Sequence, residues 1–222
     1  MDEKQLLEII EKNHWVWDDL IDPIKLIELD RLTNESINWN FTNIANREIG
    51  KTYPPNIGKG SHIFWGSTLY SDMFNGFNDK PISNIPDEIW KLTQWLLGFI
   101  SGKFENSNVN LREISINGQS MGMDGTTHID VFDNVNLDYT LMYFPNSKWE
   151  EDWGGNFQFM KEGHGSEEHN KVLKSINYVP GRLILFKAFI PHRGLAPLKP
   201  YILRKSIVWR LSIKNLNFKY NT

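Results

Sequence analysis

Seven short runs of β-branched and aromatic residues fill the second half of the chain, and they limit its fold more than any other feature. Gly, Asn and Pro separate the runs, and no segment of helical periodicity lies between them. The runs are residues 111–117, 126–132, 138–144, 156–160, 175–179, 182–188 and 201–213. Consecutive short strands without helices between them are typical of a sandwich or a jelly roll. We therefore expect a mainly β core over residues 111–213.

The first half of the chain instead has apolar residues at helical spacing. We expect helices over residues 2–12, 23–32 and 86–101, an irregular segment over 33–60 and a short strand at 63–65. No linker or internal repeat divides the sequence, so residues 1–222 are expected to form one domain. In this α+β arrangement, residues 1–110 are a helical support region that packs on the outer face of one sheet.

The composition excludes several kinds of site. The chain has 24 basic and 27 acidic residues and a net charge of −3, so we expect no binding to duplex nucleic acid or to an anionic membrane. It has no cysteine, so any metal must be bound by His, Asp or Glu. The sequence has neither a signal-peptide pattern nor an apolar run long enough for a membrane helix. We therefore expect a soluble, cytoplasmic protein.

Three candidate metal ligands lie in the β-rich half. His128 and Asp130 are two positions apart, so their side chains point the same way in an extended segment. His192 follows the apolar run at 182–188. Two imidazoles and one carboxylate can occupy one face of an octahedral iron(II) ion and leave three positions open. This combination predicts an iron site, with two alternatives: the short His-x-Asp motif also arises by chance, and a lone His after a strand is often a core residue.

The last run places three polar side chains on one face of the expected strand. Arg204, Ser206 and Arg210 share this face by the two-residue period of a strand. The planar guanidinium of Arg204 can bind a carboxylate through two hydrogen bonds, and the Ser206 hydroxyl can add a third. Arg210 is the second candidate for the same role, or for contact with a substrate. For each arginine, the alternative is a solvated strand residue.

Taken together, these motifs resemble the 2-oxoglutarate/iron(II) dioxygenases of the prolyl 4-hydroxylase-like superfamily over residues 111–213. The resemblance rests on His128-x-Asp130, Trp153-Gly154-Gly155, Pro180-Gly181-Arg182-Leu183-Ile184-Leu185-Phe186, Pro191-His192-Arg193 and Arg204-x-Ser206. It implies a double-stranded β-helix, which is a distorted, cupin-like jelly roll with N-terminal helices packed on one sheet. It also implies hydroxylation of an organic substrate with O2, coupled to conversion of 2-oxoglutarate into succinate and CO2.

The resemblance also implies roles for single residues. His128, Asp130 and His192 would be the catalytic iron(II) ligands, and Arg204 with Ser206 would bind the 2-oxoglutarate C5-carboxylate. Gly154 and Gly155 would serve the backbone geometry of a turn. Relatives often have a tyrosine that reaches the co-substrate, but Phe144 stands at that position, and Tyr143 would need a different register. Ascorbate often keeps the iron reduced in this family.

The substrate is less determined by sequence. A peptidyl substrate and a small molecule both fit the residues, and the 118–127 and 145–153 segments, with Trp149 and Trp153, are expected as loops that form pocket walls. His164 and His169 are expected to be exposed in a polar loop rather than to bind metal. Two alternative functions are a cupin-type metal dioxygenase that does not use 2-oxoglutarate and a non-catalytic jelly-roll binding module.

Overall fold

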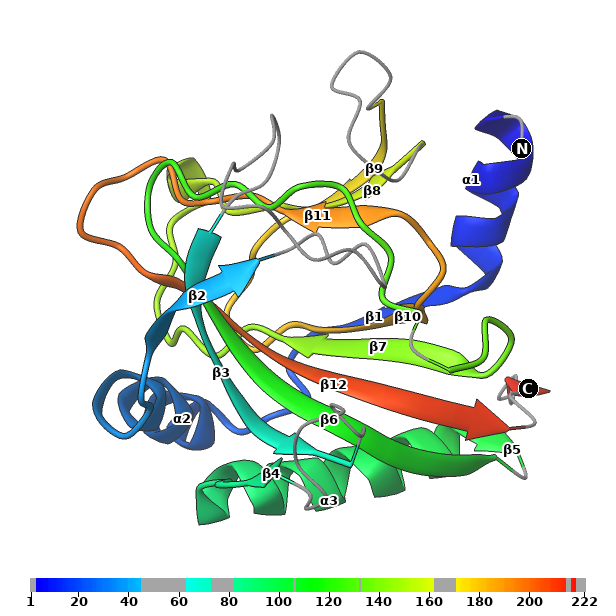
Figure 1. The fold of residues 1–222 in the computed structure, drawn as a ribbon, viewed down its shortest axis with the longest axis horizontal. Helices are drawn as coiled ribbons and strands as arrows, with labels where there is room; N and C mark the ends of the chain where they lie inside the picture. Colours follow the sequence, from blue (N-terminus) through cyan, green and yellow to red (C-terminus); the bar gives the residue numbers. More distant parts are fainter. Residues whose placement is uncertain are drawn as a thin grey trace.

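In its described residues, the computed structural model has three α-helices and a large antiparallel β structure (Figure 1). The helices are α1 (Glu3–Lys12), α2 (Pro23–Glu35) and α3 (Asp87–Lys103), close to the three helices predicted from sequence. Helix α2 begins with Pro23 in its first turn, after Asp22 caps it by accepting a hydrogen bond from the Ile24 amide. The structure describes residues 3–44, 63–72, 82–105, 107–131, 133–161, 171–214 and 217–218.

An eight-stranded antiparallel sheet forms the centre of the molecule. Along the sheet the strands are β1 (His14–Trp17), β10 (Leu183–Lys187), β7 (Asp138–Tyr143), β12 (Arg204–Lys214), β6 (Asn108–Gln119), β3 (Ile63–Ser71) and β2 (Asn40–Ile44), and β4 (Ile82–Ser83) pairs with β3. Strand β12 lies between β6 and β7. Strand β12, which carries Arg204 and Ser206, is therefore central in the sheet and hydrogen-bonded to a neighbouring strand along each edge.

A smaller sheet lies across from the large one. It consists of β11 (His192–Gly194), β8 (Phe157–Met160) and β9 (Val172–Ile176), and a short helical turn, η1 (Glu151–Trp153), precedes β8. His128 joins the edge of this sheet through an isolated bridge to His192. A separate pair is formed by β5 (Phe104–Glu105) and β13 (Asn217–Phe218).

Two apolar layers cover the two faces of the large sheet. On the outer face, α2 and α3 pack against it, with Ile89, Leu96 and Ile100 of α3 buried against the strands. In Figure 1, α2 and α3 lie along this side of the sheet. We call this the outer layer. Its strand residues include Ile114, Ile116, Leu141, Leu185, Ile207, Trp209 and Leu211.

The inner layer lies between the two sheets. Phenylalanines of β8 and β10 form much of it, and Val208 of β12 joins it. Leu6 and Ile10 of α1 also pack in the inner layer, so α1 does not join the other helices on the outer face. Because Val208 is in the inner layer while Ile207 and Trp209 are in the outer one, the predicted alternation along β12 is confirmed.

Several local predictions were wrong. Residues 126–131 do not form a regular strand, because their only ladder contact is the bridge at His128, and residue 132 lies outside the described part. The 33–60 segment contains β2, and its remainder beyond residue 44 is not described. Strand β1 had no counterpart in the prediction, and β3 is longer than expected. Gly118 and Gln119 belong to the end of β6 rather than to a loop. Among the described helices, none is long and apolar enough to cross a bilayer.

Candidate metal centre and co-substrate site

His128 and His192 lie opposite each other on adjacent backbone segments. The His128 amide donates to the His192 carbonyl at 3.0 Å, and the His192 amide donates to the His128 carbonyl at 2.9 Å. The two ring centroids are 4.4 Å apart. Reciprocal backbone hydrogen bonds therefore place two imidazoles, 64 positions apart in sequence, side by side.

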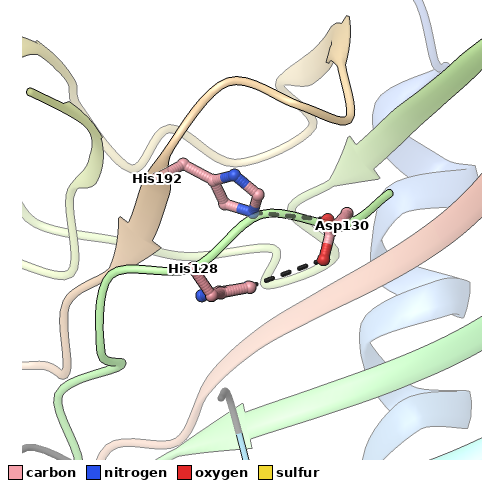
Figure 2. Close-up of side chains that lie close together, drawn as sticks. All are labelled: His128, Asp130 and His192. Carbon is pink, nitrogen blue, oxygen red and sulfur yellow. Dashed lines mark ion pairs between the residues drawn. The ribbon is translucent and has the colours of Figure 1, made fainter. Parts of the chain in front are cut away.

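Asp130 completes the group from the same segment as His128 (Figure 2). Its amide is held by the carbonyl of Ala188 at 2.8 Å. One carboxylate oxygen, Oδ2, is 3.3 Å from His192 Nε2, and the other, Oδ1, is 3.6 Å from His128 Nε2. One ligand atom from each of the three residues lies within 4.8 Å of the others. The three predicted ligands thus converge.

The outer nitrogen of each imidazole is occupied by a backbone carbonyl. His128 Nδ1 is 2.8 Å from Thr126 O, and His192 Nδ1 is 2.8 Å from Ile190 O. A carbonyl only accepts, so each Nδ1 carries a proton, and in the neutral imidazole Nε2 is the atom left to bind a metal. This arrangement is the usual support of a metal-binding histidine. Burial, with a smaller effect of His192, lowers the pKa of His128 to about 4. His128 is therefore neutral and able to bind a metal over most of the pH range.

Asp130 is 6 % exposed and remains ionised despite its burial. Burial acts to raise its pKa, but the attraction of His192, when protonated, and of the Arg210 cation outweighs this effect, and the pKa lies well below the ordinary value. The Thr140 hydroxyl donates to Asp130 Oδ2 at 2.8 Å. Arg210 Nη2 is 3.4 Å from Asp130 Oδ1, and Arg210 Nε is 3.4 Å from a Glu113 oxygen. Arg210 therefore connects the ligand carboxylate to a second acid.

Arg204 is buried on the same face of β12, with 2 % of its surface exposed. Its Nε donates to the Gly155 carbonyl at 2.7 Å, and Nη1 donates to Gln119 Oε1 at 2.9 Å. Within the described residues, Nη2 is buried without a partner and no carboxylate contacts the guanidinium. Burial lowers the pKa of Arg204 to about 10, so the group is a cation at neutral pH. A buried cation without an anion is costly, and it indicates an anionic ligand.

Aromatic rings and glycines shape the space around this guanidinium. The guanidinium carbon is 5.2 Å from the ring centre of Phe144 and 5.1 Å from that of Tyr178. A Cβ on Gly155, whose φ is 76°, would come within 3.2 Å of Arg204 Cδ and 2.8 Å of Trp149. The predicted backbone role of this glycine turn is confirmed, because only glycine allows both the conformation and the close approach.

The other predicted site residues are placed as follows. Ser206 is buried two positions after Arg204, on the inner face of β12. Tyr143 packs in the outer layer, away from the three ligands, whereas Phe144 packs in the inner layer. Trp149 contacts Tyr178, with 4.2 Å between ring centres. His164 and His169 lie outside the described residues.

Three residues beside the site were missed by the sequence analysis. Thr140 and Tyr178 lie within the predicted strands 138–144 and 175–179, where alternation could have placed Thr140 on the same face as other site residues. Gln119 was assigned to a loop, so its position opposite Arg204 on β6 was not visible. No short motif marks any of these residues, because each acts through a partner far away in sequence.

The comparison with known families agrees with this geometry. Residues 115–209 match the family described as the 2OG-Fe(II) oxygenase superfamily. The matched segment includes His128, Asp130, His192, Arg204 and Ser206. Over these residues the chain is therefore similar to a 2OG-Fe(II) oxygenase domain. No curated protein matches the sequence of the chain.

Solved structures show that the oxygenase fold extends over nearly the whole chain. A 2OG-Fe(II) oxygenase family oxidoreductase from Burkholderia pseudomallei has a TM-score of 0.60 and 16 % identity, covering 98 % of this chain and 94 % of that one. A Trichoplax adhaerens prolyl hydroxylase, solved with a hypoxia inducible factor peptide fragment, has a TM-score of 0.55 and 16 % identity, with 95 % and 90 % covered. A Pseudomonas putida prolyl-4-hydroxylase has a TM-score of 0.51 and 14 % identity, with 93 % and 98 % covered. The expected mainly β jelly roll is thereby confirmed.

Proposed function

We propose that the chain is an iron(II)- and 2-oxoglutarate-dependent dioxygenase that hydroxylates an organic substrate with O2, yielding succinate and CO2. One observation carries this proposal beyond the family. The buried, unpartnered Nη2 of Arg204 lies close to Gly194 of β11, two residues after His192. A cation held beside a three-ligand metal group suits a co-substrate that chelates the metal at one end and carries a carboxylate at the other.

The donor set fits iron(II). Two neutral imidazole nitrogens and one carboxylate are the ligands of facial iron(II) sites, which keep positions free for co-substrate and O2. His128 and His192 offer Nε2, since their Nδ1 atoms are bound to carbonyls. Asp130 is oriented by Thr140 and Arg210. The chain offers no cysteine that could replace these ligands.

Arg204 and Ser206 fit the far carboxylate of 2-oxoglutarate. The guanidinium has its Nε and one Nη1 hydrogen committed to protein oxygens, which leaves Nη2 and the second Nη1 hydrogen for a ligand. Two such parallel hydrogen bonds are the strongest arrangement an arginine makes with a carboxylate. Arg210 is already engaged by Asp130 and Glu113, so we assign it to the support of the metal carboxylate rather than to the co-substrate.

In the proposed reaction the residues of the protein bind and orient the iron and the co-substrate, and they exclude water from the site. Iron with 2-oxoglutarate supplies the oxidising chemistry, in which O2 is reduced as the co-substrate loses CO2. Arg204 holds the co-substrate in one orientation, and Thr140 and Arg210 hold Asp130. The ring centroids of Phe157 and Phe186, in the inner layer, lie 5.4 and 4.7 Å from that of His192. These rings exclude water from the side of His192 that faces the inner layer. No side chain has to act as a general base.

A peptidyl prolyl group is one candidate substrate, and a small molecule is the other. Two of the structural neighbours are prolyl hydroxylases, and one of them was solved with a peptide. At 14–16 % identity they support the fold, so substrate choice is left to experiment. Peptide and metabolite mixtures incubated with the iron-loaded protein, 2-oxoglutarate and O2 should show one product heavier by one oxygen atom.

Release of succinate from 2-oxoglutarate tests the proposed activity. The wild-type protein, with iron(II) and ascorbate to keep the iron reduced, should form succinate and CO2, and His192→Ala should not. His14→Ala is the control, because His14 Nδ1 is likewise bonded to a backbone carbonyl, that of Ile10, while its half-buried ring lies outside the site. Equal succinate from wild type and His192→Ala would contradict the proposal.

Arg204→Ala separates the proposed reaction from its alternatives. Loss of the charge-assisted hydrogen bonds should raise the KM for 2-oxoglutarate by roughly tenfold to a hundredfold. A cupin-type dioxygenase that does not use 2-oxoglutarate would instead oxidise its substrate equally well with and without Arg204. A non-catalytic jelly-roll module would release no succinate in any variant.

A further inference from the structure

Gln119 has every polar group of its side chain committed to a specific partner. It lies at the end of β6, directly across from Arg204, and is 4 % exposed. Its Nε2 donates to the carbonyls of Met123 at 2.8 Å and Gly194 at 3.0 Å, and its Oε1 accepts from Arg204 Nη1 at 2.9 Å. Two carbonyls can accept only from the amide nitrogen, so the amide oxygen must face Arg204.

These contacts leave the Arg204 guanidinium one orientation. Gln119 and the Gly155 carbonyl bind Nη1 and Nε from the protein side. Phe144 and Tyr178 lie close to the group, and a Cβ on Gly194 would come within 3.4 Å of both Nη atoms. Because Gln119 is neutral, it orients the cation without neutralising it. A glutamate at this position would orient the Arg204 guanidinium and also neutralise its charge, so the cation would no longer attract a ligand carboxylate.

We propose that Gln119 is a positioning residue that aims Arg204 at the far carboxylate of the co-substrate and so sets the length of 2-oxo acid that the site accepts. The inference rests on the proposed function. A 2-oxo acid chelated at the metal reaches Arg204 only if its carbon chain spans the distance between them. With Arg204 held rigidly, a chain shorter by one carbon falls short and a chain longer by one carbon is compressed.

Gln119→Glu is the sharpest variant because it changes one atom without changing shape. Its second carboxylate oxygen would face the Met123 and Gly194 carbonyls, where two acceptors repel it. Its charge would also pair with Arg204 and compete with a ligand carboxylate. Gln119→Met is the uncharged companion, because it keeps the length of the side chain and removes the acceptor for Nη1.

The matched control is Gln158→Glu. Gln158 lies on β8, and its Oε1 also accepts from an arginine, from Arg193 Nε at 2.9 Å. It therefore reproduces the substitution and the type of partner without touching Arg204. Binding of oxaloacetate, 2-oxoglutarate and 2-oxoadipate to the iron(II)-loaded proteins is measured by calorimetry without O2. Iron(II) binding is measured separately for each protein.

The expected result has two parts. Gln119→Glu should weaken 2-oxoglutarate binding by roughly tenfold or more, and both Gln119 variants should lose preference for 2-oxoglutarate over the shorter and longer acids. Gln158→Glu should keep wild-type affinity and preference, and iron(II) affinity should be unchanged throughout. The preference is a ratio measured on folded molecules, so it remains informative if a variant is less stable.

Other outcomes distinguish the two proposals. Wild-type affinity and preference in both Gln119 variants would overturn the role of Gln119 and leave the proposed function intact. Loss of iron(II) binding in the Gln119 variants would also overturn it, because the residue would then act on the metal group. Failure of the iron-loaded wild type to bind any of the three acids would overturn the proposed function and this inference together.

Discussion

The carboxylate of Asp130 is held by residues that do not themselves reach the metal position. Thr140 donates to Oδ2, Arg210 approaches Oδ1, and the Ala188 carbonyl accepts from the Asp130 amide. A carboxylate with both oxygens restrained presents a fixed lone pair to an incoming ion. Support of this kind commonly changes metal affinity by 10- to 100-fold. At the scale of single residues, the site therefore extends beyond its three ligands.

Thr140→Val tests this support, because it removes the hydroxyl and nearly keeps the volume. Iron(II) or cobalt(II) affinity should fall by roughly tenfold or more. The control is Thr93→Val, which removes a hydroxyl that is also fully buried but is hydrogen-bonded to Ile89 O and Trp209 Nε1 in the outer layer. This variant should lose thermal stability and keep metal affinity. Equal metal affinity of Thr140→Val and wild type, by titration, would show that the hydroxyl has no such role.

Strand β12 shows how much of an element could be predicted from its sequence. The two-residue period put Arg204 and Ser206 on one face of the strand, and the structure agrees, with Val208 in the inner layer and Trp209 in the outer one. The same reasoning failed for residues 126–131, because only His128 pairs with a neighbour there. A single bridge requires extended backbone only at His128. The two-residue period could therefore predict that the His128 and Asp130 side chains point the same way, but it could not show that the segment forms no regular strand. The partners Gln119 and Tyr178 depended on register between strands, which one strand's pattern does not contain.

Lys205, between two site residues on β12, is fully buried on the opposite side of the strand. It forms an ion pair with Asp30 of α2 and hydrogen bonds with Thr33 Oγ1 at 2.7 Å and Asn34 Oδ1 at 2.8 Å. Asp30 in turn accepts from the Ser147 amide and hydroxyl. This network ties helix α2 to the start of the strand that carries Arg204.

Lys205→Met should destabilise the protein by on the order of 3 kcal/mol, because the partly buried Asp30 carboxylate loses its counter-charge. Lys199→Met is the matched control, since Lys199 pairs with Asp152 at 2.8 Å where both side chains are exposed. That pair should contribute less than about 1 kcal/mol. Denaturant unfolding of the two variants measures the difference, and similar losses in both would contradict the assignment.

The Lys205–Asp30 ion pair also predicts how the free energy of unfolding depends on pH. Burial acts to raise the pKa of Asp30, but hydrogen bonds from Lys205 and Ser147 outweigh it and lower the pKa below its ordinary value. A carboxyl group with a lower pKa in the folded state stabilises the fold above its unfolded pKa of about 3.9. This stabilisation is lost as the pH falls through the folded value. In Lys205→Met, the free energy of unfolding should therefore fall less steeply below about pH 4 than in wild type. Parallel pH profiles would contradict this.

For the whole molecule, the mainly β class and the three helices followed from sequence, but the outline of the large sheet did not. Strand β1 has four residues and begins two positions after a helix, so it is too short to show a period. Strands β1, β2 and β3 all come from the region that was expected to be helical support. Their place in the sheet depends on pairing with β10 and β6, which lie far away in the chain.

The two apolar layers should contribute to different properties. Leu96→Ala empties a position in the outer layer and should cost about 2–5 kcal/mol of stability with metal affinity unchanged. Phe157→Leu acts in the inner layer, where the ring lies 5.4 Å from that of His192, and should lower both stability and metal affinity. Unfolding and metal titration of both variants test the separation. Weaker metal binding by Leu96→Ala, measured while the protein is folded, would contradict it.

Because His128 and His192 are hydrogen-bonded to each other through their backbones, the geometry of the metal group depends on the register of these two segments. A shift of one residue on either side would turn that imidazole to the opposite face, and the displaced molecule would take up no ion. Metal binding therefore reports whether the two segments have paired in the correct register. The share of molecules that retain an ion after gel filtration counts those whose two sheets closed correctly, which gives a rapid screen for refolded or redesigned versions of this chain.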